Sequence, residues 1–187
     1  GVLSGLNREG LAIALNLVYG EEDADEGVPL TLALQRVLTE ATTLEEADRR
    51  IRETPFASCN NVTVCDAGGR AAVYEVGPGR LDRRDLAADP LLATNHLASC
   101  RVLPDGTPMS VSSHGRYRLL RGMRGSIRRR ASLGEVRRAL RRVAVPWINL
   151  QSMIFDPARR ELWLSMGRVP AARGTFVRFP ASSLWRS

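Results

Sequence analysis

Asn16 is the first side chain in this sequence whose type and position could serve a reaction. It interrupts an apolar strand pattern, on the face that it shares with Ala12 and Ala14. Small neighbours leave room above a sheet, so the Asn16 carboxamide could donate a hydrogen bond to a developing oxyanion. The plain alternative is a buried asparagine that bonds only to main-chain groups.

Asn95 and Arg116 are two further candidates. Asn95-His96 ends a short strand expected at 91–95, where a polar pair can face a cleft. Arg116 is expected at the start of a helix that begins near Gly115, where a cation opposes the positive end of the helix dipole. Such a placement indicates another role, for example orienting a carboxylate or a nucleophile. One more surface arginine and a loop-capping asparagine remain the simpler alternatives.

Two weaker pairings also involve residues with suitable chemistry. His96 and Cys100 could form a Cys–His dyad, because imidazole activates a thiolate, but a single short loop is an awkward frame for it. Asp66 and Glu75 flank a predicted hairpin and could act as paired carboxylates. The pattern favours the simpler explanation, a turn aspartate before Gly-Gly and a glutamate at the rim of the sheet.

Composition and charge narrow the class of protein. The 187 residues carry a net charge of +7, fit one domain over 1–187, and contain arginine but no lysine. The arginines concentrate in 121–142, which is typical of a surface for nucleic acid or an acyl carrier, or of a solvated helix face. In the helix expected from Ser132 they occupy the face opposite the apolar stripe, which favours the solvated face. Aromatic residues make up only 5%, which weighs against nucleic acid.

The sequence contains no signal for a bound cofactor, a metal site or a membrane-spanning segment. Three cysteines without a CxxC pair argue against a zinc site and favour a reducing, cytoplasmic setting. Neither a GxGxxG after a strand nor a Walker-type loop is present, so we expect no nucleotide cofactor. No apolar run is long enough to span a membrane. Oligomeric state is not readable, and a homo-oligomer stays open.

The order of elements predicts an α+β fold. Hydrophobic periodicity and capping signals give grouped strands and grouped helices, so we expect antiparallel sheets with helices layered on them. The expected strands are 2–6, 11–18, 57–66, 70–76, 91–95, 148–155, 161–166 and 174–179, and the expected helices begin near residues 29, 43, 115 and 132.

The candidate residues also belong to an ordered set of motifs along most of the chain. These are Gly5-Leu6-Asn7-Arg8-Glu9-Gly10-Leu11, Ala14-Leu15-Asn16, Asn61-Val62-Thr63-Val64-Cys65-Asp66 with Gly69 and Glu75, Ala93-Thr94-Asn95-His96, Arg116-Tyr117-Arg118, Met153-Ile154-Phe155-Asp156-Pro157 and Leu162-Trp163. The set resembles the penicillin (isopenicillin N) acyltransferase-like family of N-terminal-nucleophile hydrolases, which is related to choloylglycine hydrolases, penicillin V acylases and acid ceramidases.

The resemblance implies a fold and a mechanism. The fold is the αββα sandwich, and the mechanism is attack on a linear amide by an autocatalytically exposed N-terminal cysteine, whose α-amino group acts as base. By motif position, Asn16 is similar to the family's oxyanion-binding asparagine, Asn95 to the asparagine beside the nucleophile, and Arg116 to the arginine that polarises the site. A small-molecule acyl amide is then the expected substrate.

The sequence departs from the family at the nucleophile. The family's cysteine, with the arginine and aspartate that follow it, lies upstream of the glycine-rich hairpin with which this sequence opens. Cys59, Cys65 and Cys100 do not stand at a chain start. We therefore expect a fold that is incomplete at its N-terminus, a missing N-terminal segment as partner, and little activity from this chain alone. A degenerate family member and a basic, non-catalytic binding domain are the alternatives.

Overall fold

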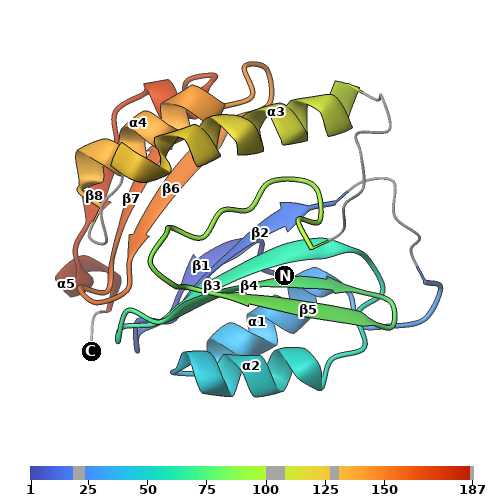
Figure 1. Cartoon of the computed structure of the whole chain (residues 1–187). Coiled ribbons are helices and arrows are strands. Elements are labelled where there is room, and N and C mark those ends of the chain that lie inside the picture. The colour runs from blue at the N-terminus through green and yellow to red at the C-terminus, as the bar shows by residue number, and fades with distance from the viewer. Residues whose placement is uncertain (19–23, 100–107, 127–130, 186–187) are drawn as a thin grey trace.

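The computed structural model describes residues 1–18, 24–99, 108–126 and 131–185. Two antiparallel sheets face each other, and each carries helices on its outer side (Figure 1). Helices α1 (Leu30–Glu40) and α2 (Leu44–Arg52) cover one sheet, while α3 (Pro108–Met123) and α4 (Leu133–Val143) lie over the other. The predicted α+β class and its αββα layering are confirmed.

The larger sheet has five strands in the order of the sequence, each antiparallel to its neighbour. Its strands are β1 (Ser4–Leu6), β2 (Ala12–Leu17), β3 (Asn60–Cys65), β4 (Ala71–Gly77) and β5 (Arg80–Asp85). The first four follow the predicted hairpins closely. The fifth was not predicted, because its sequence RLDRRD is mostly charged and offers no apolar alternation.

The smaller sheet has three strands, also in sequence order. They are β6 (Gln151–Asp156), β7 (Glu161–Met166) and β8 (Val177–Phe179), and short helical turns η1 (Arg124–Ser126), η2 (Ala171–Arg173) and α5 (Ala181–Leu184) complete the described elements. The turn between β6 and β7 joins two strands that the sequence predicted, and in it the main-chain N–H of Arg159 donates to the Asp156 carboxylate at 3.0 Å.

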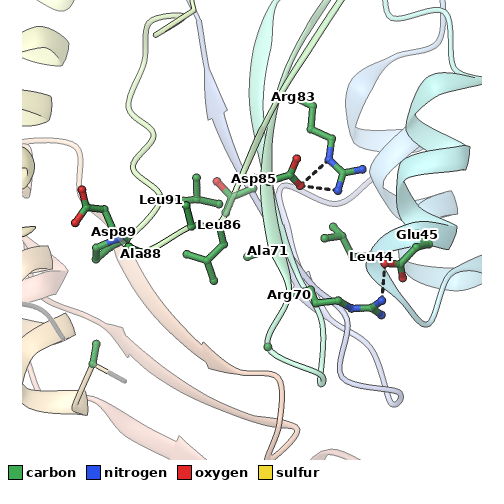
Figure 2. A pocket seen from close by; sticks show the side chains of 15 residues that line it. Leu44, Glu45, Arg70, Ala71, Arg83, Asp85, Leu86, Ala88, Asp89 and Leu91 are labelled. Atoms are coloured by element: carbon green, nitrogen blue, oxygen red, sulfur yellow. Dashed lines mark hydrogen bonds and ion pairs between the residues drawn. The ribbon is translucent and has the colours of Figure 1, made fainter. Parts of the chain in front are cut away.

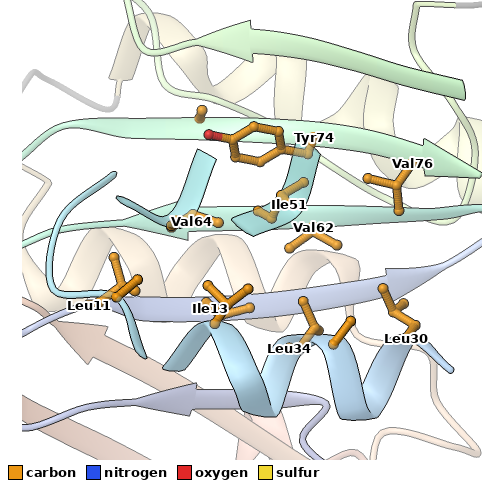
Figure 3. Close-up of a cluster of buried hydrophobic side chains, with 14 of the residues drawn as sticks. Leu11, Ile13, Leu30, Leu34, Ile51, Val62, Val64, Tyr74 and Val76 are labelled. Carbon is orange, nitrogen blue, oxygen red and sulfur yellow. The ribbon is translucent and has the colours of Figure 1, made fainter. Parts of the chain in front are cut away.

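The principal core lies between α1, α2 and one face of the five-stranded sheet (Figure 3). Period-two alternation sends Leu11 and Ile13 to this face, and the predicted helix stripes meet them there. Burying each large apolar side chain stabilises the fold by about 1.5–3 kcal/mol. The buried residues drawn from the helices and sheet include Leu30, Leu34, Val37, Leu44, Ala47, Ile51, Val62, Val64, Tyr74 and Val76. The same sheet therefore has a second face that is free of this core.

Two of the predicted helix starts are confirmed, and one is wrong. The Ser132 capping box is present, because the Ser132 hydroxyl accepts from the Glu135 N–H while Glu135 accepts from the Ser132 N–H. Thr43 also caps its helix, accepting from the Glu46 N–H. The helix expected near Gly115 instead begins at Pro108, so that prediction was wrong by two turns. Among the described residues, no helix is both long and apolar enough to cross a bilayer.

Asp66 ties the β3–β4 hairpin to the start of α2. It is buried and accepts hydrogen bonds from the Leu44 N–H at 3.1 Å and from Arg70, through N–H at 3.1 Å and Nε at 2.8 Å. Burial alone would raise the pKa of Asp66, but these hydrogen bonds hold the pKa below the ordinary value for aspartate. The register puts Glu75 opposite Asn61, several residues further along, so Asp66 and Glu75 are not paired carboxylates.

Asp66→Asn should destabilise the protein by about 2 kcal/mol at pH 7, because an amide nitrogen would face donors that now bind a carboxylate. The folded-state pKa is lowered, so the carboxylate's contribution is present above pH 3.8 and is lost as the pH falls through the folded value. Urea unfolding should show the gap between variant and wild type narrowing below about pH 4. Asp89→Asn, at an exposed carboxylate, is the control, and an equal loss there would contradict the assignment.

Candidate functional site

A row of polar side chains crosses the face of the five-stranded sheet that points away from α1 and α2. The strand register aligns four residues from four strands: Asn16, Asn61, Glu75 and Asp82. Asn61 and Glu75 are fully buried. Because directly opposed residues in antiparallel strands lie on one face with their Cβ atoms about 5 Å apart, the row is a continuous polar band between the sheets.

Asn61 binds the segment that carries Asn95. Its side-chain amide donates to the main-chain oxygens of Thr94 and His96, both at 2.8 Å. The strand predicted at 91–95 was wrong, since these residues form no strand. They lie instead as a connection across the polar row, held by side chains rather than by a ladder. Buried main-chain carbonyls need such partners when a sheet does not supply them.

Glu75 binds the far end of the same segment. Its carboxylate accepts from the Ala98 N–H at 3.0 Å, the Ser99 N–H at 2.9 Å, the Ser99 hydroxyl at 2.6 Å and Arg84 Nε at 3.0 Å. Arg84 also donates to the Leu92 oxygen at 3.1 Å. Glu75 is thus a buried, paired anchor, and not the rim glutamate or acid–base group that the sequence suggested.

Asn95 and Arg116 are brought together directly. Arg116 Nη2 donates to Asn95 Oδ1 at 3.0 Å, and Asn95 Nδ2 donates to the main-chain oxygen of Leu17 at 2.7 Å. Arg116 lies in the middle of α3, so the expected clash with a helix N-terminus does not exist. Burial lowers the pKa of Arg116 below the ordinary value for arginine, yet a guanidinium stays protonated at neutral pH.

Asn16 lies beside this pair. It precedes Leu17, which accepts from Asn95, and it is opposite Asn61 across the β2–β3 ladder. Within the part of the chain that the structure describes, the Asn16 carboxamide makes no hydrogen bond. A half-buried amide without a protein partner can donate to a bound group. The structure therefore gathers Asn16, Asn95 and Arg116 at one place.

The described cysteines are not placed as nucleophiles. Burial, assisted by Asp66 and Asp156, raises the pKa of the Cys65 thiol to about 11, so it is protonated at neutral pH. Cys59 is buried, and neither Cys59 nor Cys65 forms a disulfide. Cys100, the partner of the conceivable dyad with His96, lies outside the described residues.

A hollow of about 1030 Å³ lies against the five-stranded sheet and the segment that follows β5 (Figure 2). Thr63, two residues along β3 from Asn61, is part of its wall, and Ala71, Leu86 and Leu91 give it apolar surface. Charged residues stand around these apolar groups, with Arg83 bound to Asp85 and Arg70 bound to Glu45. Sequence reasoning missed this hollow, because it depends on the unpredicted strand β5 and on the path of 86–91.

A family model described as acyl-coenzyme A:6-aminopenicillanic acid acyl-transferase matches residues 1–127. The chain belongs to this acyl-transferase family. The match covers the three candidate residues, so the family resemblance expected from the motifs is confirmed. No curated protein is found to match the sequence.

Two solved structures share the fold of this chain. Penicillin V acylase from Agrobacterium tumefaciens has a TM-score of 0.67 and 15% identity, over 98% of this chain and 67% of the acylase chain. A variant of conjugated bile acid hydrolase from Clostridium perfringens has a TM-score of 0.60 and 14% identity, over 95% of this chain and 72% of that one. At such identities the likeness establishes the fold alone.

Asn61→Asp should destabilise the protein by at least about 3 kcal/mol, because it removes both donors and sets a carboxylate against two buried carbonyl oxygens. Gln35→Glu makes the same change of amide to carboxylate on the exposed side of α1, and should cost less than about 0.5 kcal/mol. Denaturant unfolding at pH 7 measures both. Equal, small effects would mean that Asn61 does not hold the 94–96 segment.

Proposed function

We propose that this acyl-transferase family member takes part in cleaving or forming a linear amide C–N bond, with Asn16, Asn95 and Arg116 around the reacting carbonyl. The observation that carries the proposal is the chain of hydrogen bonds from Arg116 to Asn95 to Leu17. It joins residues from β2, from the 94–96 segment and from α3, although Leu17 and Asn95 are 78 positions apart. Proteins of similar fold named penicillin V acylase and bile acid hydrolase support an amide-directed reaction.

Each side chain has capacity left for a reaction. Asn16 offers an amide that bonds to no described residue and is suited to hydrogen-bond an oxyanion. An asparagine side chain has two N–H donors and two lone pairs. Asn95 uses one donor to bind Leu17 and one lone pair to accept from Arg116. Its remaining donor and acceptor are available to a nucleophile and its amine. The Arg116 cation would stabilise negative charge that develops on the substrate.

The nucleophile that we propose is a cysteine at the mature N-terminus of the full-length protein, upstream of residue 1, exposed by autoprocessing. Its own α-amine, which titrates near pH 8, would serve as base. The protonated state of Cys65 and the burial of Cys59 support a cysteine from elsewhere. The segment that contains it is then the partner of this chain, which alone would be inactive.

The substrate class that we propose is a small acyl amide. The hollow next to Thr63 supports it, because its apolar walls could take an acyl group while the polar row receives the amide. The lack of a disulfide at Cys59 and Cys65 supports a reducing compartment such as the cytoplasm. Penicillin V, a conjugated bile acid and N-acyl amines are the first probes, with water and a free amine as competing acyl acceptors.

The deciding measurement is the intact mass and N-terminal sequence of the native, full-length protein. A mature chain that contains residues 1–187 and begins with cysteine is the expected result. A native protein without an N-terminal cysteine would contradict the hydrolase proposal and favour a degenerate member that keeps the fold without the chemistry.

In the full-length protein, Asn16→Ala and Asn95→Ala should each lower kcat/KM about 100-fold, as the loss of an oxyanion-directed donor does. Arg116→Gln, which keeps a hydrogen-bonding amide but removes the charge, should cost a similar factor. Arg118→Gln, an exposed position in the same helix, is the control and should leave the rate unchanged. Release of the amine measured by chromatography decides this, and full activity in all three variants would remove the residue assignment.

One observation favours the alternative, a basic binding domain. A hollow of about 620 Å³ beside α4 is lined by Met123, Arg138, Arg141, Arg142 and Arg173, and no described carboxylate lies in its wall. Arginines at i, i+3 and i+4 spacing repel one another, so a bound polyanion would stabilise this face of the helix. Nucleic acid is the anion that the alternative requires.

If this surface binds nucleic acid, affinity for a fluorescent single-stranded oligonucleotide should fall steeply with salt, with a log–log slope of about −3 for four contacts. Arg138→Gln/Arg142→Gln should make the slope shallower by about 1.4. Arg36→Gln/Arg118→Gln removes the same charge from α1 and α3 and should leave the slope unchanged. Binding that ignores salt, or no binding, would eliminate this function.

A further inference from the structure

Both histidines of the sequence meet at the junction between the 94–96 segment and α3. The rings of His96 and His114 stack with centroids 3.8 Å apart and planes inclined by 13°. The ring of Tyr117, one turn further along α3 from His114, meets His96 edge-on at 5.3 Å. The imidazole of His96 therefore packs against a patch of α3 on either side of the position that carries Arg116.

Two buried hydroxyls fix the same ring in its plane. His96 Nδ1 lies 2.8 Å from Ser113 Oγ and 3.1 Å from Thr94 Oγ1. The Ser113 hydroxyl donates in turn to Thr94 Oγ1 at 3.1 Å. Ser113 and Thr94 are almost wholly buried, so no bulk water competes for these bonds. A hydroxyl of α3, a hydroxyl of the 94–96 segment and a ring nitrogen thus close a three-membered network.

The charges around His96 oppose its protonation. His114 and Arg116 face it from α3, Arg84 faces it from β5, and Glu75 on β4 is the one facing anion among the described groups. Burial in first place, and then the positive neighbours, lower the pKa of His96 to about 4. The ring is neutral at pH 7. At that pKa it would be a poor general base, because catalysis is most effective when the pKa lies near the working pH.

We propose that His96 is a positioning residue of the site: its neutral ring joins the 94–96 segment to α3 and so sets the Arg116 guanidinium against Asn95. The inference rests on the proposed function for its catalytic consequence, but the joint itself rests on the contacts alone. Asn61 fixes the segment to the sheet, and His96 fixes the helix to the segment. Without the second connection, the Arg116–Asn95 and Ser113–Thr94 bonds are the remaining hydrogen bonds between α3 and the 94–96 segment among the described residues.

Acid weakens this joint, because the pKa of His96 differs between the unfolded and the folded chain. An unfolded histidine titrates near pH 6.5, whereas the pKa of folded His96 is lowered to about 4. The unfolded chain therefore binds the proton first. The contribution of the joint is complete above about pH 6.5 and is lost as the pH falls to about 4. Protonated His96 would face His114 and Arg116 at close range, which weakens the hold on the helix.

The first test follows the two ring signals by NMR from pH 7.5 to 3.5, in the full-length protein, with His96→Phe and His114→Phe variants to assign them. We expect the His96 signal to stay that of a neutral ring at pH 6 and to move only as the pH approaches about 4. A His96 signal that titrates near the ordinary value of about 6.5 would overturn the proposal, because the ring would then be solvated and not locked in the junction.

The second test compares His96→Phe with His96→Asn. Phenylalanine keeps an aromatic ring on His114 but lacks Nδ1, whereas the asparagine amide reaches the place of Nδ1 and does not titrate. We expect His96→Phe to lower kcat about 10-fold or more with little change in KM, as loss of a transition-state contact does. His96→Asn should restore most of kcat and remove the acid limb that the wild-type pH–rate profile shows as the pH approaches about 4. Arg118→Gln is the control.

Equal activity in the two variants, with the wild-type acid limb in both, would contradict the positioning role. If the wild-type protein shows no amide hydrolysis or transfer, the proposed function fails instead. The joint is then decided by thermal unfolding, since His96→Phe should flatten the dependence of Tm on pH between 6.5 and 4, and an unchanged dependence would overturn it.

Discussion

The Asn61 side chain gives both of its amide hydrogens to the main chain of a segment that forms no strand or helix of its own. Everything at the site is placed relative to that connection. It fixes Thr94 and His96 on the sheet, which turns Asn95 toward Leu17 and Arg116, and it leaves Asn16 as the neighbouring amide. A buried amide can do this because leaving its two partner carbonyls unpaired would cost more than ordering the segment.

The two faces of the five-stranded sheet therefore have different roles. One face buries apolar side chains against α1 and α2 and supplies most of the stability. The other carries Asn16, Asn61, Glu75 and Asp82 in one row, where hydrogen bonds position groups at a modest net gain in stability. Because strand side chains alternate, a polar residue can be placed on the second face without disturbing the first. The chemistry and the core can vary independently.

Much of this arrangement could be predicted from local pattern. The structure confirms the elements that were predicted from short-range signals, because each such signal lies within a few residues. These signals are the alternation around Leu11 and Ile13, the apolar stripes of α1 and α2, and the capping box at Ser132. Asn16, Asn95 and Arg116 stood out as polar residues in unusual places, and the motif order linked them. The α+β class followed from the grouping of the elements.

The rest depends on contacts between distant residues, which no local pattern encodes. Strand β5 has a charged sequence and is a strand because β4 offers it an edge. The 91–95 segment reads as a strand but is held by Asn61 and Glu75 instead. Arg116 was expected at a helix start because Pro108 was not recognised as the first helical residue. Asn61 itself gave a signal, a polar residue in a strand, but its partners lie 33 and 35 positions away.

The bond from Asn95 to Leu17 closes a loop of 78 residues, and this separation has a consequence for the order of folding. The β3–β4 and β4–β5 hairpins and the α1–α2 pair join near neighbours and can form early, while a closure of this length is entropically costly until the sheet exists. We expect the site to be assembled among the last steps. A polypeptide still emerging from the ribosome would then have its framework before it has any means of reacting.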